Sequence, residues 1–268
     1  MAECVVGKIE ASVETNLFDG EHTMSFKFHA VAALAAVAAL AAPAHALTLA
    51  TNTLQADAKL TFDATAVSNA KAANVSFGEF ANSTRLADVD GTLANGKVIK
   101  VPVYNFPITK ADVSVSGSLK ITPNYGLSDR SGLRLISDGG DVMLANFKVD
   151  YNTKIMSADL FDLFNKVQIA KQMPLYSFVQ TQADVISLKG LVLNMTNQIG
   201  TLKFTPEAVE KLSAGLGLDP VLSNALSSLD WGVLDVQVTS YARKPKVDDT
   251  PLTLADMPES VYGEYVPE

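Results

Sequence analysis

The chain has 268 residues, of which 48% are hydrophobic and 19% are charged, and its formal net charge at pH 7 is −8. This length allows one large domain or two small ones, because all-β domains often reach this size alone. The acidic balance and the lack of any basic run exclude a nucleic-acid groove, which needs clustered Lys and Arg to neutralise phosphates.

The N-terminal part of the chain has the pattern of an export signal. Residues 30–42 form a 13-residue apolar run, shorter than the roughly 20 residues that span a bilayer. Lys27 precedes this run, and Ala44-His45-Ala46 fits the small-x-small pattern of a signal-peptidase site. We therefore predict a signal peptide over residues 24–46, and the alternative interpretation is a buried Ala/Leu helix. Residues 1–23 are then a mis-assigned upstream extension, because a signal peptide normally begins the chain.

Removal of this leader determines which chemistry remains. All three histidines and the single cysteine precede residue 47: Cys4, His22, His29 and His45. A mature chain from Leu47 has no imidazole and no thiol. It therefore excludes Ser-His-Asp and Cys-His nucleophiles, metal sites ligated by His or Cys, and disulfides. We predict an exported protein of the periplasm, cell surface or exterior that is not an enzyme, with no metal, no cofactor and no transmembrane segment in the mature chain.

Alternation of apolar and polar residues is the main pattern of the predicted mature chain. Apolar residues occupy every second position through 54–64, and the same period appears in 113–121 and 143–151. A further strand-like run covers 233–241. A period of two indicates strands with one face in water.

Turn residues separate these runs. Asp138-Gly139-Gly140-Asp141 predicts a hairpin between 132–137 and 142–151, and Asn95-Gly96 predicts another hairpin before 98–106. Asn152-Thr153 separates the following pair of runs. Several short strands at this spacing are typical of a sandwich or an open barrel.

Two segments carry helix signals. Thr205-Pro206-Glu207 combines an N-cap hydroxyl, a proline at the first helical position and an acid in the first turn. Asp219-Pro220 opens a second short helix in the same way. Residues 157–170 fit either a helix capped by Ser157 or a strand. The predicted fold is all-β, an antiparallel sandwich-like sheet or open barrel, with a two-helix insert near 205–229.

The predicted strands and helices form a single β-rich domain over 47–244. Gly117–Pro123 resembles Gly200–Pro206, and Pro102–Phe106 resembles Pro174–Phe178, so two similar halves are an alternative. Residues 245–268 hold four prolines and six acids, which is typical of a surface-draped or disordered tail. The residues expected in the core are Leu60, Phe62, Leu135, Phe147, Val149, Phe178, Leu193 and Trp231.

Two motifs match known catalytic signatures in their residues, and one set of acids offers possible calcium donors. Asp88–Leu93 reads D-x-D-G-T-L, the signature of haloacid-dehalogenase-type phosphatases, but the preceding residues are too polar for the buried strand that this chemistry needs. Ser68–Lys71 matches S-x-x-K without its companion boxes. Calcium donors near turns lack the known spacings: Asp88, Asp90, Asp138, Asp141 and Asp150. We interpret all three as ordinary turn and surface chemistry.

One resemblance concerns the C-terminal half. Gly200–Ala208, followed by a strand at 232–244, resembles the C-terminal part of HtaA-type and related exported bacterial β-domains, and the hairpin within 131–151 is also similar. Some members of that group bind haem through a tyrosine supported by a histidine, so the resemblance implies a haem-like carrier as an alternative. Five of the seven tyrosines are candidates, without a histidine beyond residue 47: Tyr104, Tyr125, Tyr151, Tyr176 and Tyr241. No ligand residue is assigned, and we interpret these tyrosines as buried or rim residues of the sheet.

We therefore expect an exported, non-enzymatic binding or structural protein of the bacterial envelope or exterior. Its partner would be a small ligand or a component of the envelope or surface. A secreted hydrolase that uses two carboxylates is the enzymatic alternative, and it requires two acids about 5–9 Å apart in a cleft. A small-ligand carrier is the third candidate, and it requires a dry pocket of several hundred Å³.

Overall fold

The computed structural model describes residues 45–50, 53–115, 121–189 and 192–262. These residues belong to one compact unit, Ala36–Glu268. The predicted signal peptide up to residue 44, the upstream extension and residues 263–268 of the tail lie outside the described residues. Among the helices in the described ranges, none combines the length and apolar character needed to cross a membrane.

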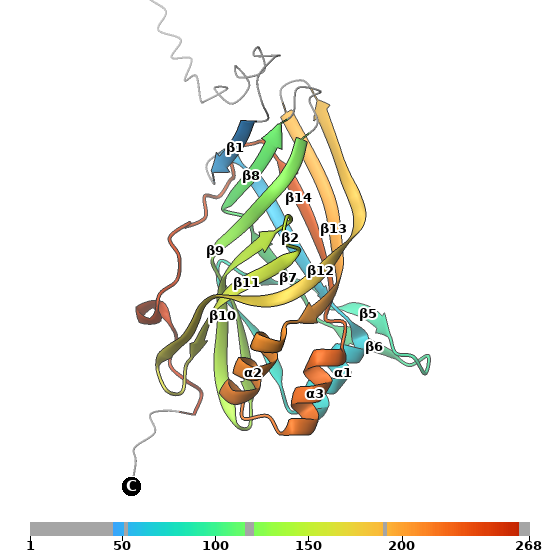
Figure 1. The fold of residues 1–268 in the computed structure, drawn as a ribbon, viewed down its shortest axis with the longest axis vertical. Coiled ribbons are helices and arrows are strands. Elements are labelled where there is room, and N and C mark those ends of the chain that lie inside the picture. Colours follow the sequence, from blue (N-terminus) through green and yellow to red (C-terminus); the bar gives the residue numbers. More distant parts are fainter. Residues whose placement is uncertain (1–44, 51–52, 116–120, 190–191, 263–268) are drawn as a thin grey trace, which may run out of the picture. The chain divides into compact units, whose positions relative to one another are not determined.

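Twelve strands form one antiparallel sheet, in the order β1-β8-β9-β10-β11-β12-β13-β14-β2-β7-β4, with β3 paired to β9 (Figure 1). Its strands are β1 His45–Ala50, β2 Gln55–Phe62, β3 Ser76–Ala81, β4 Thr84–Arg85, β7 Val103–Pro107, β8 Lys110–Val115, β9 Ile121–Ser137, β10 Gly140–Asp150, β11 Ile155–Asp162, β12 Val167–Lys189, β13 Val192–Phe204 and β14 Gly232–Thr239. A separate two-stranded sheet pairs β5 Val89–Thr92 with β6 Val98–Val101.

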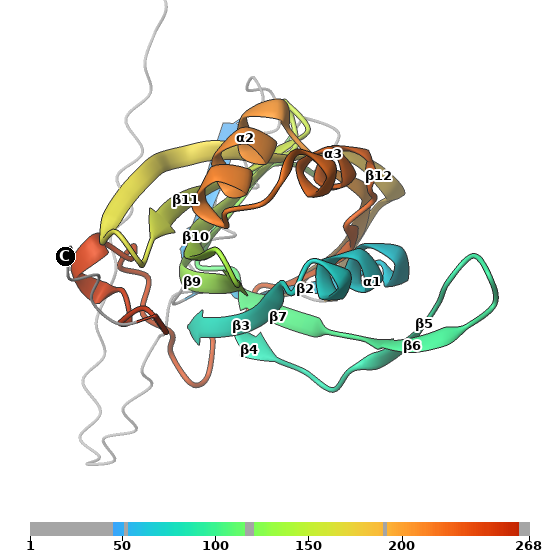
Figure 2. The ribbon, with the colours of Figure 1, turned by 90° about the horizontal axis from the view of Figure 1, so that it is seen from below.

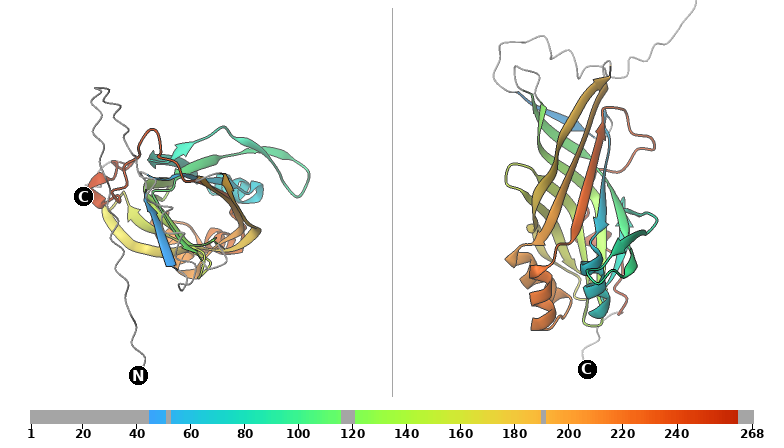
Figure 3. Two further views of the ribbon diagram at one scale, coloured as in Figure 1. Left: turned by 90° about the horizontal axis from the view of Figure 1, so that it is seen from above. Right: turned by 90° about the vertical axis from the view of Figure 1, so that its right-hand side faces the viewer.

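The large sheet curls because β7 and β8 are consecutive in the chain but lie near its opposite edges, next to the edge strands β4 and β1. β7 pairs with β2, and the backbone N–H of Ile108 then donates to Ala56 O at 2.8 Å. The next N–H, that of Thr109, donates to Leu127 O on β9 at 2.8 Å, and β8 continues along β9. Figure 3 shows the resulting curl from above and from the side. The predicted all-β class is confirmed, and the single curled sheet corresponds to the open-barrel form of the prediction.

The main hydrophobic core fills the inside of the curl. Six of the eight predicted core residues are buried: Leu60, Phe62, Leu135, Phe147, Phe178 and Trp231. Val149 is half-buried and packs against the same core. The side chain of Leu193 lies outside the described residues.

Three helices lie across one end of the curl (Figure 2). They are α1 Ala64–Ala72, α2 Pro206–Gly215 and α3 Pro220–Ser228. Thr205 and Asp219 cap α2 and α3 as predicted, so the two-helix insert is confirmed. α1 was not predicted: the alternation that we extended to residue 64 ends at Phe62, and the Asp63 carboxylate caps a helix by accepting from Thr65 N at 2.7 Å.

The strand boundaries differ from the prediction in one segment and settle an open alternative in another. The alternating run 113–121 is not one strand, because β8 ends at Val115 and Val115 pairs with Ile121 across an antiparallel hairpin. The ambiguous residues 157–170 contribute to two strands, β11 and β12, and contain no helix. The predicted hairpins at Asn95-Gly96 and at residues 138–141 are confirmed, as is the turn at Asn152-Thr153.

Candidate functional site

The interior of the curl is packed rather than hollow. It holds a cavity of about 50 Å³, lined mostly by aliphatic and aromatic side chains. Tyr151 Oη donates to Asn197 Oδ1 at 3.5 Å beside this cavity, and burial raises the pKa of Tyr151 to about 12. Pockets that hold small molecules usually measure about 300–1,000 Å³. The interior is therefore a core with a small packing defect, and a candidate site lies on the outer face.

The outer face is distorted where β9, β10 and β12 each carry a residue in the left-handed backbone region. Arg130 has φ 56°, Asn146 has φ 53° and Gln172 has φ 47°. The registers of β10 with β9, of β10 with β11, and of β11 with β12 shift beside these residues. Such bulges bend a sheet and redirect side chains. Non-glycine residues with positive φ are uncommon and are enriched at functional positions, so this line of bulges indicates a candidate site.

The bulge residues join in one buried polar network. Asn146 and Asp159 are 3% and 4% exposed. Asn146 Nδ2 donates to Asp159 Oδ2 at 2.7 Å, and Asn146 Oδ1 accepts from the Arg130 backbone N–H at 3.2 Å. The Gln172 backbone N–H donates to Asp159 Oδ1 at 2.7 Å, and Gln172 Nε2 donates to Asn146 O at 2.7 Å. The buried carboxylate and amide are thus satisfied, as buried polar groups must be.

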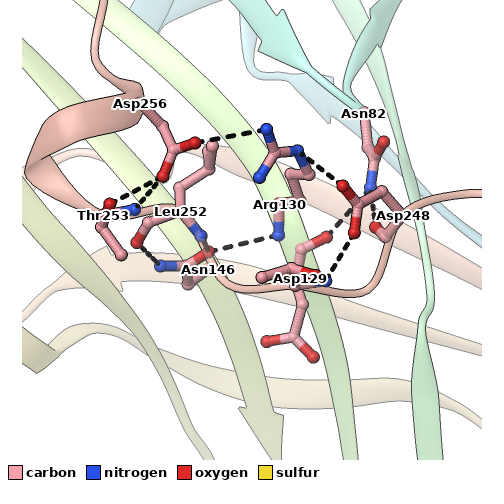
Figure 4. A network of polar contacts seen from close by, with 9 residues as sticks. Asn82, Asp129, Arg130, Asn146, Asp248, Leu252, Thr253 and Asp256 are labelled. Atoms are coloured by element: carbon pink, nitrogen blue, oxygen red, sulfur yellow. Dashed lines mark hydrogen bonds and ion pairs between the residues drawn. The ribbon is translucent and has the colours of Figure 1, made fainter.

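The same network holds the C-terminal segment against the sheet (Figure 4). Asn146 Nδ2 donates to Leu252 O, and Asn146 Oδ1 accepts from Leu252 N, both at 2.8 Å. The Arg130 guanidinium contacts Asp248 Oδ2 at 3.2 Å and Asp256 Oδ1 at 3.3 Å. Asn82 Nδ2 donates to Asp248 O at 2.6 Å. We call residues 248–261 the strap.

An apolar contact accompanies these polar ones. The Leu252 side chain is 3% exposed and belongs to a small hydrophobic cluster that is separate from the main core. The cluster's other members lie on β10, on β11 and just beyond β11, and they are Met143, Ala145, Phe161 and Leu163. Burial of a leucine is worth about 1.5–3 kcal/mol. The strap therefore covers apolar side chains that would otherwise face water.

A second clamp fixes the end of the strap. Asp141 is fully buried, and its carboxylate accepts from Arg134 Nη2 at 2.6 Å, from Ser260 Oγ at 3.1 Å and from Val261 N at 3.0 Å. Arg134 Nη2 also donates to Glu259 O at 2.9 Å. The hydrogen bond to Asp141 raises the pKa of Arg134. Asp141, a calcium donor candidate in the sequence, thus serves to anchor the strap.

The strap and the β11–β12 turn enclose an open surface groove of about 540 Å³. Its lining residues are Leu163, Lys166, Leu254, Ala255, Met257, Pro258 and Glu259. Lys166 Nζ and Glu259 Oε2 are 3.4 Å apart, with 49% and 82% of their side chains exposed. The groove therefore offers an apolar lining together with one cation and one anion, and it falls in the size range of ligand pockets.

The sequence motifs lie elsewhere. The Asp88–Leu93 signature occupies the β5–β6 hairpin, which extends away from the sheet (Figure 2). Asp88 contacts Arg85 at 2.9 Å, and Asp90 contacts Lys100 at 2.7 Å on exposed surface, so neither carboxylate lies at the end of a buried parallel strand. Among the described residues, no three of His, Cys, Asp and Glu gather closely enough to hold a metal. The candidate donor Asp138 follows the end of β9, Asp150 is the last residue of β10, and Ser68 and Lys71 lie on α1.

The five tyrosines do not form one site. Tyr104, Tyr151 and Tyr176 are buried in the main core, and Tyr104 Oη has no hydrogen-bond partner in the described part of the chain. The Lys148 ammonium lies 5.3 Å from the centroid of the Tyr125 ring. Tyr241 is exposed. This distribution agrees with the interpretation of these tyrosines as buried or rim residues of the sheet.

No family model and no curated protein matches the chain. Among solved structures, the C-terminal domain of HtaA from Corynebacterium glutamicum is similar at 11% sequence identity and a TM-score of 0.39. That match covers 69% of this chain and 96% of that domain. A likeness at this level is weak and assigns no function to the chain.

Proposed function

We propose that this protein is an exported binding protein of the bacterial envelope or exterior, and that it binds its partner in the strap groove without catalysing a reaction. The proposal rests on the difference in volume between the strap groove and the interior cavity. The groove measures about 540 Å³, whereas the interior cavity measures about 50 Å³. The lining of the groove fits a ligand that carries an apolar group next to a charged or polar one.

The two alternatives have less support. A carrier that encloses its ligand needs several hundred Å³ of interior space, which the core does not offer. A carboxylate-based hydrolase needs two acids free to face a substrate. The buried acids nearest the strap, Asp141 and Asp159, are instead saturated by hydrogen bonds from the chain itself.

Photo-crosslinking in the producing cell tests the binding site. A photoreactive amino acid is placed at Leu254, which lines the groove and is 40% exposed, and in a control protein at Val221 on α3, which is 76% exposed. We expect a discrete adduct from position 254 and none from position 221. Equal adducts from both positions, or none from either, would contradict the proposal.

Export has its own test, which is the intact mass of the natural protein. The sequence predicts cleavage after Ala46, so the mature protein should begin at Leu47. Recovery of folded natural protein that retains residues 1–46 would contradict the proposed processing on export. It would also leave three histidines in the working protein.

A further inference from the structure

We infer that the outer face of β9, β10 and β11 is a peptide-binding surface that recognises an Asp-x-x-x-Leu-x-x-x-Asp segment, which ends in the short 3-10 helix Leu254–Asp256, and that it accepts this segment from a second copy of the chain as well as from its own strap. The inference is independent of the proposed function, because it concerns the surface beneath the strap and not what enters the groove beside it.

The contacts beneath the strap have the features of peptide recognition. Asn146 donates to the carbonyl and accepts from the N–H of one strap residue, Leu252, as a neighbouring strand would. Leu252 inserts into the small apolar cluster and supplies side-chain selectivity. Main-chain bonds for affinity and a pocket for specificity are two elements of peptide recognition on a sheet.

Charge fixes the register of the segment. Asp248 and Asp256 lie four residues before and four residues after Leu252, and a single guanidinium, that of Arg130, contacts both. A segment shifted by one residue would lose both ion pairs and remove the leucine from its pocket. The recognised pattern is therefore present in full within Asp248–Asp256.

The connection to the body makes exchange between copies feasible. Arg243 is buried and anchors the chain beside β2 by donating to Asp57 Oδ1 and Ala56 O. Lys244, Pro245 and Lys246, between this anchor and the strap, are exposed. Exchange of an identical segment is a low-cost route to dimers. A short tether gives an effective concentration of the order of mM, so at micromolar concentrations each copy holds its own strap until the tether is cut.

The test cuts the tether in the otherwise complete chain. A protease site is inserted between Lys246 and Val247, and the cut protein is passed through a sizing column and then mixed with a fluorescent synthetic peptide of residues 247–262. We expect the cut strap to co-elute with the body, and the peptide to replace it with rising fluorescence anisotropy. Loss of the strap on the first column, or unfolding of the body on cutting, would overturn the inference.

Peptide variants test the recognition pattern without altering the body. Leu252→Ala, and Asp248→Asn combined with Asp256→Asn, should each raise the Kd of the peptide at least about tenfold. Val261→Ala is the matched control, because that side chain is exposed and its backbone N–H to Asp141 is retained, and its Kd should stay within about twofold. Equal Kd values for all peptides would refute specific recognition. Peptide exchange without any crosslink at position 254 would keep this inference and reject the proposed function.

Discussion

At the scale of single residues, Asn146 joins two parts of the chain that lie 106 positions apart. Its side-chain amide forms hydrogen bonds with both the N–H and the C=O of Leu252. The same amide also donates to Asp159. A side chain in this position is costly to remove, because an unsatisfied buried polar group costs about 1–3 kcal/mol and a charged one costs more.

Substitution Asn146→Gly tests this role, because glycine retains the freedom to adopt the positive φ of this position. We expect the free energy of unfolding in urea to fall by about 2–4 kcal/mol, since Asp159 and the Leu252 backbone lose their partner. The control is Asn152→Gly in the exposed β10–β11 turn, which should cost at most about 1 kcal/mol. Equal losses in the two variants would show that the Asn146 amide does not stabilise the fold.

Residues of the core were predictable from sequence, whereas those of the site were not. Leu60 and Phe62 lie on the apolar phase of an alternating run, so their burial follows from a period of two. Arg130 and Asn146 carry no such signal, because their positive φ and their partners depend on distant segments. The acidic, proline-containing composition of the tail was visible, but the pairing of Asp248 and Asp256 with one arginine was not.

At the scale of elements, the helices show what local signals can and cannot predict. α2 and α3 begin with a capping side chain followed by proline, and both were predicted. α1 follows its cap Asp63 without a proline, and its first residue, Ala64, continued the alternation of β2 by chance. Its buried residues Ala66, Val67 and Ala70 have helical spacing, which was the signal available to find it.

The end of α2 packs against the β9–β10 hairpin at a position that only glycine allows. Ser137 Oγ donates to Leu216 O at 2.6 Å, and a Cβ at Gly140 would overlap the Gly215 carbonyl. We therefore expect Gly140→Ala to lower the free energy of unfolding by more than about 2 kcal/mol, because backbone must move. The control is Gly96→Ala, where nothing lies within 4 Å and only the positive φ of 80° is strained, at about 1 kcal/mol. A smaller loss at residue 140 than at residue 96 would contradict the packing described.

At the scale of the whole molecule, acid should release the strap. Hydrogen bonds from the Thr250 backbone lower the pKa of Asp248, those from the Thr253 side chain lower the pKa of Asp256, and Arg130 lowers both further. Thr250 and Thr253 belong to the strap itself, so Arg130 is the group on the body that makes docking favour the ionised carboxylates. This stabilisation is complete above the ordinary Asp pKa of about 3.9 and is lost as pH falls through the lowered values.

Amide exchange of the strap at pH 6 and pH 3, corrected for intrinsic rates, measures this release. We expect protection of residues 248–256 to fall at pH 3. In the Asp248→Asn, Asp256→Asn double variant it should be weak at both pH values. Burial raises the pKa of the neighbouring Asp129, so that group titrates above the window in which the strap is lost. Equal protection of the natural strap at both pH values would exclude a role for these carboxylates.

Both the groove and the peptide surface require the strap to be part of the folded body. Hydrogen–deuterium exchange of the purified protein at neutral pH measures this directly. The structure predicts that the Leu252 amide, bonded to Asn146 and buried, exchanges slowly alongside β10. Exchange of residues 248–261 at the rate of an unstructured chain, while β10 stays protected, would contradict it.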